Sequence, residues 1–288
     1  MIRALAILLL LTQAASAAEL KIATWNLEWL TTNPAGLPED AHPKPQAGIA
    51  ALRRYALALD ADVVAFEEVD GPAVAAEIFP PDRYRILITA DHVTQRVGFA
   101  VRLGIPVRQN PDLAALDVQP RARFRLRTGA DITLGLPTGP FRLLAIHLKT
   151  GCHRDSLGSE RPACRTLAEQ VPPLQAWLAQ RRAEGIPFVV LGDFNREMDP
   201  RRGRPDELLA ALDDAAPLAR ATEGHASPCW GGTTFIDHIL AGGPARAWLE
   251  PDTLRVLVYR ERDPASRETL SDHCPVSIRF RLPEGTAP

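Results

Sequence analysis

Residues 186–195 read IPFVVLGDFN, an apolar run that ends at Asp193 and Asn195. The run predicts a β-strand, so the carboxylate and the amide lie at its end or just beyond it. Polar groups at strand ends can converge at one edge of a sheet, where catalytic sites tend to be built. A single strand end of this kind is more often a capped turn, because Asp and Asn favour turns. The rest of the chain decides between these two interpretations.

Five other segments place a polar residue at the end of an apolar strand or inside one. They are TWNLE at 24–28, FEEV at 66–69, AIHL at 145–148, SDH at 271–273 and, within its strand, IDH at 236–238. Capped turns account for one such segment but not readily for six in one chain. Carboxylates, amides and imidazoles gathered in this way suit a hard cation such as Mg²⁺. We therefore expect a metal-dependent site at the edge of a sheet.

Apolar runs elsewhere in the chain predict the framework that carries these segments. Strands are expected at residues 20–25, 62–66, 84–89, 97–102, 132–136, 141–147, 235–240, 254–259 and 275–282. Helical spacing covers residues 49–59 and 165–182, and Pro172 and Pro173 are expected to bend or split the second helix. Over 121–127, arginine alternates with apolar residues, which predicts a strand with four guanidinium groups on one face. Because strands follow both helices and other strands, the pattern favours an α/β layered domain with mixed sheets.

Composition limits the class of protein. The chain has 288 residues, a formal net charge of −2 and 46% hydrophobic residues. This globular mixture excludes a disordered chain, a coiled coil, a collagen-like fibre and a repeat solenoid. The near-neutral charge argues against a protein that binds nucleic acid through a large net positive field. No linker interrupts residues 18–288, so we expect one domain there.

The N-terminus has the pattern of a secretory signal peptide over residues 1–17. Arg3 is followed by an apolar run at residues 4–11 and a small-x-small ending at residues 15–17. Cleavage after Ala17 predicts a secreted or periplasmic protein. The run is shorter than the roughly 20 residues that span a bilayer, and no later segment reaches that length, so no transmembrane segment is expected.

The four cysteines suggest disulfides, since an exported protein folds under oxidising conditions. Cys152 and Cys164 flank a short polar loop, and a bridge between them would be worth roughly 3 kcal/mol by loop entropy. Cys229 and Cys274 are far apart in sequence, which leaves their pairing open. The chain has no C-x-x-C motif, so a structural zinc site is not expected.

The order of the polar segments resembles the endonuclease/exonuclease/phosphatase superfamily of metal-dependent phosphoesterases. The motifs T-W-N, E-E in place of Q-E, H-L, G-D-x-N, I-D and S-D-H follow one another over residues 22–280. The resemblance implies an α/β layered sandwich of two packed mixed β-sheets flanked by helices. The segment HLKTGC at 147–152 is similar to a secreted bacterial subgroup with a cysteine in the loop after the histidine strand.

The resemblance also implies a metal site. Mg²⁺ would be the cofactor, with Mn²⁺ or Ca²⁺ able to substitute, and Glu68 would be its direct ligand. The implied metal-site residues are Asn26, Glu28, Glu68 and Asp272.

Five residues take catalytic roles by the same resemblance. Asp193 would align and deprotonate the attacking water, and Asn195 would steady the phosphoryl oxygen. His273 would contact the phosphate, oriented by Asp237, with His147 as a second histidine. Phosphodiester hydrolysis builds charge on the phosphoryl oxygens, so a cation and imidazole donors are what it requires.

The chain departs from the family pattern at three positions. Glu67 stands where the family has glutamine, and we expect it to face away from the site. Gln95 stands near the position of an acidic residue that would support His147, which weakens the case for deoxyribonuclease activity. His238 follows Asp237 where an aromatic residue is common, and we interpret it as a packed neighbour.

Arginines are the candidate contacts for substrate phosphate. Arg121 and Arg123 lie on the predicted arginine face, and Arg96 precedes a strand near the site. The alternative is that this face is a solvated sheet edge kept soluble by charge.

These features predict an exported phosphodiesterase that acts on nucleic acid, most simply an endonuclease. The alternative is a phosphoesterase for phospholipids or small phosphorylated molecules, for which Trp29-Leu30 and residues 229–232 are the only hints of a membrane-entering loop. A non-catalytic binding protein would have broken ligands, and none of the principal ones is broken. We expect a monomer with nucleic acid as substrate and no stable protein partner.

Overall fold

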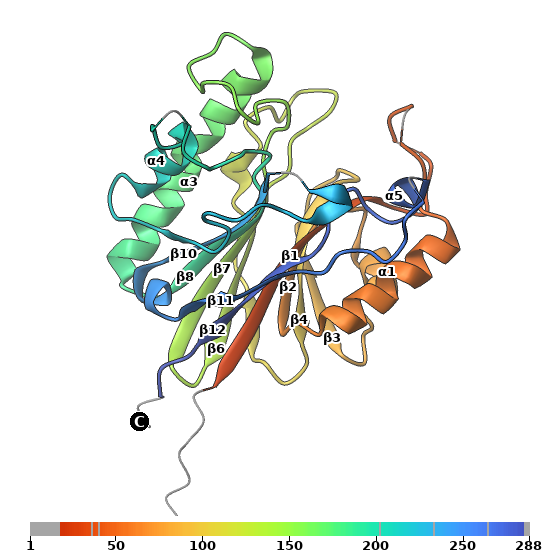
Figure 1. Ribbon diagram of the computed structural model, residues 1–288, viewed down its shortest axis with the longest axis horizontal. Helices are drawn as coiled ribbons and strands as arrows, with labels where there is room; N and C mark the ends of the chain where they lie inside the picture. The colour runs from red at the N-terminus through yellow and green to blue at the C-terminus, as the bar shows by residue number, and fades with distance from the viewer. Residues whose placement is uncertain are drawn as a thin grey trace, which may run out of the picture.

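A computed structural model describes residues 18–284 except 36, 40, 202, 233 and 264. In this part of the chain, two six-stranded sheets pack face to face (Figure 1). The first has the strand order β11 (Leu249–Val256), β12 (Val276–Arg281), β1 (Glu19–Leu30), β2 (Val63–Val69), β4 (Arg96–Arg102), β3 (Tyr84–Ile88). The second has the order β5 (Val107–Gln109), β6 (Ala130–Leu136), β7 (Gly139–His147), β8 (Phe188–Asp193), β10 (Asp237–Gly242), β9 (Ala219–Arg220). The predicted α/β sandwich of two packed mixed sheets is confirmed, and the expected signal peptide lies outside the described residues.

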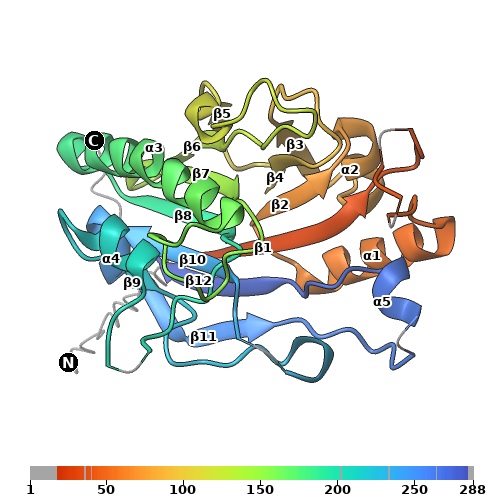
Figure 2. The ribbon, with the colours of Figure 1, turned by 90° about the horizontal axis from the view of Figure 1, so that it is seen from above.

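Each sheet is mixed because it contains one parallel pair of strands. β1 is parallel to β2 and β7 is parallel to β8, whereas the other described pairs are antiparallel. Helices cover both outer faces of the sandwich (Figure 2). They are α1 (Gln46–Leu59) and α2 (Pro72–Ile78) on the first sheet, α3 (Pro162–Glu184) and α4 (Glu207–Asp213) on the second, and the short α5 (Ala265–Thr269) near the start of α1.

Side chains on the central strands alternate between two hydrophobic layers. On β7, Leu143 and Ala145 lie between the sheets, whereas Leu144 and Ile146 lie in the layer under α3. This alternation is the period of two expected for a strand buried on both faces. Truncating a buried side chain of this kind, as in Leu143→Ala, typically lowers the free energy of unfolding by about 2–5 kcal/mol. The core therefore holds the strand ends, and the polar groups on them, in fixed positions.

The strand predicted over residues 121–127 is wrong, because this segment is irregular and its arginines share no face. Arg121 and Arg123 are exposed, whereas Arg127 is buried. Side-chain carboxylates accept hydrogen bonds from backbone N–H groups that would otherwise pair with a neighbouring strand. The N–H of Leu126 donates to Asp117 at 3.3 Å, and that of Thr128, directly after the segment, donates to Asp91 at 2.9 Å. Alternation alone does not make a strand when no neighbouring strand is available to pair with it.

The helix expected over residues 165–182 is continuous and is not split by Pro172 and Pro173. It forms the middle of the 23-residue α3. The two prolines lie on its solvent side, where water can satisfy the carbonyls that lose a partner, and buried residues on either side of them, such as Val171 and Leu174, anchor the helix to the sheet. No helix within the described residues is long and apolar enough to cross a bilayer.

Two disulfides tie loops to the sandwich. Cys152 bonds to Cys164, which confirms the predicted bridge between the loop after β7 and the first turn of α3. Cys229 bonds to Cys274, a pairing that the sequence spacing left open. Each bridge includes a cysteine that closely follows a histidine of the candidate site.

Candidate active site

Three adjacent strands of the second sheet bring polar residues to one edge. His147 is level with Asp193 across the parallel pair of β7 and β8, and Asp237 is level with Asp193 on the antiparallel β10. Directly opposed residues on neighbouring strands project to the same face of a sheet. The strand-end motifs of the sequence therefore meet here as expected.

The glycine before Asp193 is required by the close approach of β7. Gly192 has φ of +139°, and a Cβ at this position would lie 2.0 Å from the carbonyl oxygen of Ile146. After Asp193 the chain turns sharply, because Asn195 adopts a left-handed φ of 52°. Asn195 then holds Asp193 through its backbone N–H at 2.7 Å and its Nδ2 at 3.1 Å.

The first sheet contributes residues from distorted strand ends. The pairing of β1 with β2 changes register after Asn26, and the pairing of β2 with β4 changes register before Val69. Glu28, Trp29 and Glu68 have φ of 43°, 50° and 61° in this region. Bulges re-aim side chains, and left-handed non-glycine residues store strain that clusters at functional sites.

Asn26 connects the two sheets. Its Nδ2 lies 3.1 Å from Glu68 Oε1 and 3.1 Å from Asp193 Oδ2, while its Oδ1 accepts a hydrogen bond from Glu28 N at 2.9 Å. His147 completes the junction, since its Nε2 is 3.6 Å from Glu68 Oε1 and 3.5 Å from Asp193 Oδ2. One amide thus holds a carboxylate from each sheet, with an imidazole beside both.

His273 reaches the same cluster from the loop before β12. Its Nδ1 lies 2.8 Å from Asp237 Oδ2 and its Nε2 lies 3.9 Å from Asp193 Oδ2. Ser271 anchors the loop by donating to Asn26 O at 2.7 Å and accepting from His273 N at 3.0 Å. The candidate ligand atoms of Asp193, Asp237 and His273 all lie within 4.8 Å of one another.

Burial and charge set the protonation of this cluster. Burial raises the pKa of Asp193 to about 7, and the charge of Asp237 adds to the shift while His273 opposes it. Burial would lower the pKa of His273, but Asp237 and Asp193 outweigh it and hold the pKa well above its ordinary value. Burial and the nearby Arg127 lower the pKa of His147 well below its ordinary value. At neutral pH, His273 is therefore charged and His147 is neutral.

Glu28 and Asp272 lie together but are held by other partners. Glu28 Oε2 accepts hydrogen bonds from Lys44 Nζ at 2.9 Å and from Asp272 N at 3.2 Å. Lys44 is itself buried and donates to Glu268 O at 2.9 Å. Burial and Asp272 raise the pKa of Glu28, whereas Lys44 lowers it. Asp272 is partly exposed, with Oδ1 3.7 Å from His273 Nε2.

Glu67 does not face away, so that expectation is wrong. The side chain is fully buried, accepts a hydrogen bond from Thr24 Oγ1 at 3.0 Å and interacts electrostatically with Asp237 and Asp193. Burial, followed by the charges of these two aspartates, raises the pKa of Glu67 well above its ordinary value. These effects favour the protonated, uncharged form of the Glu67 side chain, which would resemble the glutamine that the family has at this position.

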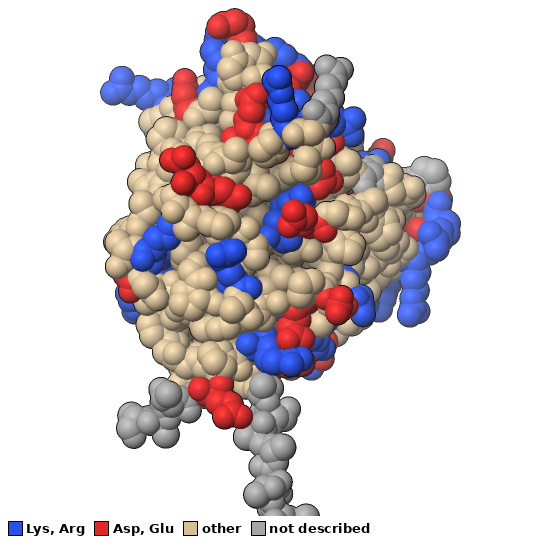
Figure 3. Space-filling view, turned by 60° about the vertical axis from the view of Figure 1, so that its left-hand side comes forward, with Lys and Arg blue, Asp and Glu red and all other residues tan. Residues whose placement is uncertain are grey.

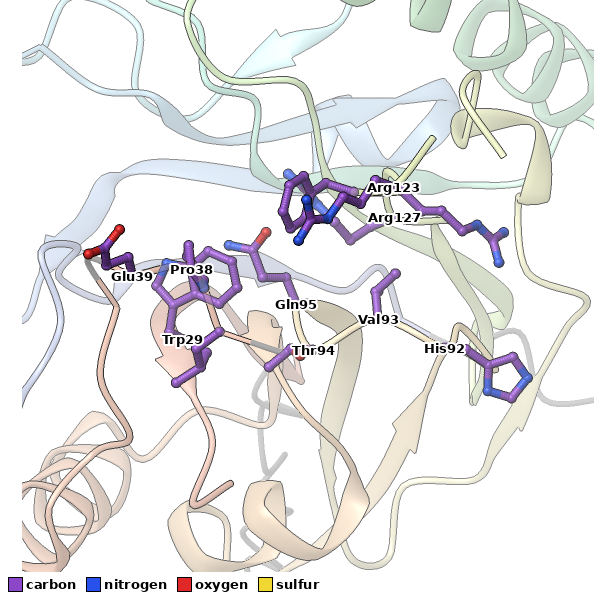
Figure 4. Close-up of a pocket in the computed structure, with 12 residues that line it drawn as sticks. Trp29, Pro38, Glu39, His92, Val93, Thr94, Gln95, Arg123 and Arg127 are labelled. Carbon is purple, nitrogen blue, oxygen red and sulfur yellow. The ribbon is translucent and has the colours of Figure 1, made fainter. Parts of the chain in front are cut away.

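The structure separates the candidate arginines. A groove of about 870 Å³ opens beside the cluster and is lined by Arg123 but not by Arg121 or Arg96 (Figure 4). Arg96 instead directs its Nε toward Val93 O at 3.4 Å. Gln95 lines the same groove, and His147 Nδ1 has no hydrogen-bond partner in the described part of the chain.

Arg127 is a site residue that the sequence analysis did not single out. It lines the groove, donates from one terminal nitrogen to Leu148 O at 3.1 Å and has no partner for its Nε among the described residues. It is only 8% exposed and interacts electrostatically with Glu68 and Asp193. Nothing in the sequence pattern separates it from the three arginines before it.

His238 is a packed neighbour, as its sequence position suggested. Its ring is fully buried, with Nδ1 2.6 Å from Thr222 Oγ1 and Nε2 2.9 Å from Arg196 O. It supports the segment after Asp193 without reaching the cluster's carboxylates.

Comparisons with known proteins identify the family of this chain. Residues 23–273 match the model of the Endonuclease/Exonuclease/phosphatase family. No curated protein matches this chain in sequence. Similar solved structures include truncated TDP2 from Caenorhabditis elegans (14% identity, 92% of this chain and 98% of that chain, TM-score 0.60) and the 3′-5′ exonuclease NExo from Neisseria meningitidis (18%, 91% and 100%, 0.59). The human Nocturnin catalytic domain is also similar (16%, 91% and 94%, 0.55). At these identities the likeness is one of fold, whereas the family match spans most of the chain, which therefore belongs to the endonuclease/exonuclease/phosphatase family.

Proposed function

We propose that this protein is an exported, Mg²⁺-dependent phosphodiesterase that cleaves nucleic acid as an endonuclease. One observation carries the proposal. Asp193 Oδ2 lies 3.1 Å from Asn26 Nδ2, 3.5 Å from His147 Nε2 and 3.9 Å from His273 Nε2. A buried carboxylate between two imidazoles, at the junction of two sheets, has the surroundings of a general base in phosphoester hydrolysis.

The residues fit a divalent cation. Glu68, Asp193 and Asp237 bring three carboxylates together, and Asp237 Oδ1 has no hydrogen-bond partner among the described residues. Burial raises the pKa of Asp193, the charge of His273 opposes this shift and the charge of Asp237 adds to it, so a bound cation would stabilise the charged form of the carboxylate. Glu68 would hold the cation, and Asn26 would position Glu68. When bound, Mg²⁺ would stabilise negative charge on the phosphoryl oxygens, and Mn²⁺ or Ca²⁺ would use the same oxygen donors.

Asp193 and His273 would carry out the proton and charge steps. Asp193, whose pKa is near 7, would accept a proton from the attacking water. His273, charged and held by Asp237, would donate a hydrogen bond to a phosphoryl oxygen. Asn195 would be a positioning residue, because its Nδ2 already donates to Asp193 Oδ2 and to Leu148 O at 3.1 Å each.

His147 and Arg127 would bind the phosphate from the other side. Neutral His147 can donate one hydrogen bond without adding charge, whereas Arg127 supplies a positive charge and an unpartnered Nε. Guanidinium groups bind phosphate oxygens well because their donors match the spacing of those oxygens. The pair would place the phosphodiester beside Asp193.

Nucleic acid is a better substrate class than phospholipid. Leu30 is fully buried, and Trp230 donates from its indole to Ser271 O at 2.9 Å and packs on Tyr259. Leu30 and Trp230 are therefore engaged within the fold, and the partly exposed Trp29 lines the groove beside arginine residues instead of forming a contiguous apolar surface. Charges of both signs are interspersed on the face in Figure 3, so local arginines rather than a broad positive field would bind the substrate.

The cellular setting and oligomeric state belong to the same proposal. Two disulfides within the described residues support an oxidising compartment, secreted or periplasmic. Residues 1–17 would be the signal that directs export, and the mature chain would act as a monomer.

The test uses the chain from Ala18 onward with supercoiled plasmid and Mg²⁺. We expect nicking that is abolished by EDTA and by Asp193→Ala. If the plasmid stays intact, single-stranded DNA, RNA, phospholipids and small phosphoesters are assayed next. Cleavage of a phospholipid or a small phosphoester with no activity on DNA or RNA would overturn the nuclease proposal.

A further inference from the structure

The groove beside the catalytic cluster has aromatic and cationic residues on its walls. Trp29, Pro38 and Glu39 form one side and Arg123 and Arg127 the other, as Figure 4 shows, and Leu37 also lines the groove. The remaining lining residues are His92, Val93, Thr94, Gln95, Phe124 and Arg125. The groove thus combines two aromatic rings with three guanidinium groups.

Phe124 presents its ring to solvent. It is 70% exposed, and the only other large hydrophobic side chain that is exposed among the described residues is Leu103, at 47%. The guanidinium of Arg123 lies 5.3 Å from the centroid of the Phe124 ring. An aromatic ring with a cation stacked against it can also stack with other flat, polarisable groups.

Trp29 is held at the groove by a strained backbone. Its φ of 50° is in the left-handed region, and its N–H donates to Glu68 Oε2 at 3.0 Å. The backbone of Trp29 is therefore hydrogen-bonded to Glu68, the carboxylate proposed to bind the metal. Strain of this kind persists only where the surrounding structure enforces it.

Arg127 joins the groove to the catalytic cluster. It is more than nine-tenths buried, its Nε is unpartnered among the described residues, and it interacts electrostatically with Glu68 and Asp193. A phosphate bound at Arg127 would place the next part of the substrate in the groove. The groove therefore lies where the next nucleotide of a polynucleotide substrate would extend from the scissile bond.

We propose that this groove is a nucleobase subsite that takes an unpaired nucleotide next to the scissile phosphate. The base stacks on Phe124 and Trp29, and Arg123 binds a flanking phosphate. A groove of positive charge with aromatic platforms is how proteins bind single-stranded nucleic acid, because every base has a face available for stacking. A base inside a duplex has both faces covered by its neighbours. The inference rests on the proposed function and adds a preference for single-stranded or frayed substrate.

A lipid surface is a poorer occupant of the groove. Membrane-binding surfaces need contiguous apolar area, whereas Phe124 stands between Arg123 and Arg125. Leu103 follows the far end of β4, away from the end that pairs beside Glu68. Among the described residues, Phe124 and Leu103 are therefore separate exposed hydrophobic side chains, and the other apolar side chains that line the groove are only partly exposed.

The test compares Phe124→Leu and Phe124→Tyr with the unmodified protein. Turnover is measured on a short single-stranded oligonucleotide, on the same strand in a duplex, and on a single strand whose residues lack bases. We expect Phe124→Leu to raise KM on the single strand roughly 5- to 100-fold, the size of one lost base–aromatic stack, with little change in kcat. Phe124→Tyr keeps the ring and should restore KM. On the base-free strand, Phe124→Leu should match the unmodified protein.

Arg121 and Arg123 provide a matched pair of controls. Both are exposed in the same loop, but only Arg123 lines the groove. Arg123→Gln should raise KM on the single strand, whereas Arg121→Gln should not. Equal effects of the two changes would point to general charge and would overturn the assignment of Arg123.

A binding measurement separates failure of the subsite from failure of the proposed function. Fluorescence anisotropy of a labelled single-stranded oligonucleotide, measured in EDTA, gives the binding affinity in the absence of turnover. Weaker binding by Phe124→Leu supports the subsite even if the protein cleaves no nucleic acid. Unchanged affinity and KM, or an equal loss on the base-free strand, overturns it. Loss of binding to phosphatidylcholine vesicles with oligonucleotide affinity intact would also overturn it and assign Phe124 to a lipid surface.

Discussion

Asp237 Oδ2 lies 2.8 Å from Nδ1 of His273, and this pair directs the other imidazole nitrogen toward Asp193. The orienting aspartate comes from β10 and the histidine from the loop before β12, so each sheet supplies one partner. A carboxylate in this position fixes the orientation of the ring and stabilises its charged form. The pair therefore links the packing of the two sheets to the orientation of His273, on which its proposed contact with the phosphate depends.

Replacing Asp237 with Asn should remove this charge while keeping the shape. We expect kcat to fall roughly 10²- to 10⁴-fold, because His273 loses its fixed orientation and its charge. KM should change little. Asp263→Asn, in the loop before α5, is the control and should have normal turnover. Full activity of Asp237→Asn would show that His273 needs no orienting partner.

Asp193→Asn should lower the activity of the protein and raise its thermal stability. We expect kcat to fall by at least roughly 10³-fold because the proposed base is lost. In EDTA, the melting temperature should rise. Folding raises the pKa of Asp193 to about 7, so the folded state loses stability as pH rises from 3.8 to about 7, and the amide avoids this loss. Calorimetry at neutral pH checks the sign, and a lower melting temperature would contradict it.

Gly192→Ala should be strongly destabilising. The new Cβ would lie 2.0 Å from Ile146 O at a φ of +139°, so β7 and β8 must separate. We expect a loss of about 3 kcal/mol or more in the free energy of unfolding, together with displacement of Asp193. Gly71→Ala is the matched control, since a Cβ there meets nothing within 4 Å. Urea unfolding of the two variants measures the difference.

His238 should make stability depend on pH. Burial lowers the pKa of His238 to about 4 from its ordinary 6.5. The unfolded chain takes up this proton near pH 6.5 and the folded chain does not, so stability is complete above pH 6.5 and falls by about 3 kcal/mol as pH drops to about 4. Urea unfolding at both ends of this range should show a smaller fall for His238→Gln. An equal fall would assign the acid sensitivity to other groups.

Arg127→Lys should weaken substrate binding. Lysine keeps the charge but loses the planar donors that match a phosphate, so KM should rise about 10-fold, equivalent to roughly 1.4 kcal/mol. Arg96→Lys is the matched comparison, because Arg96 lies off the groove and directs its Nε toward Val93 O. A larger effect at Arg96 than at Arg127 would reverse the assignment of the phosphate contact.

Local patterns were sufficient to predict most of the framework. The buried strands have apolar runs of strand length, and motifs at or near strand ends mark Asn26, His147, Asp193, Asp237 and His273. Backbone pairing of neighbouring strands holds His147, Asp193 and Asp237 level. Asn26, from the other sheet, and His273, from the loop before β12, reach them through side-chain contacts.

The parts that could not be predicted depend on long-range contacts. Residues 121–127 have the alternation of a strand, but the backbone N–H of Leu126 donates to Asp117, and that of Thr128, directly after the segment, donates to Asp91. Glu28 is held by Lys44 and by the backbone of Asp272, which is 244 residues away. Arg127 differs from Arg121 only in what surrounds it after folding. Sequence spacing carries no information on such pairings.

The two disulfides anchor both histidine segments of the candidate site. Cys152 follows His147 by a short loop, and its carbonyl accepts a hydrogen bond from Arg196 at 2.8 Å, while Cys274 directly follows His273. Where thiols are kept reduced, both histidine segments lose their covalent anchors. Under the proposed function, we expect the chain to be inactive until both bridges form, so that a cell producing it would be protected from cleavage of its own nucleic acid.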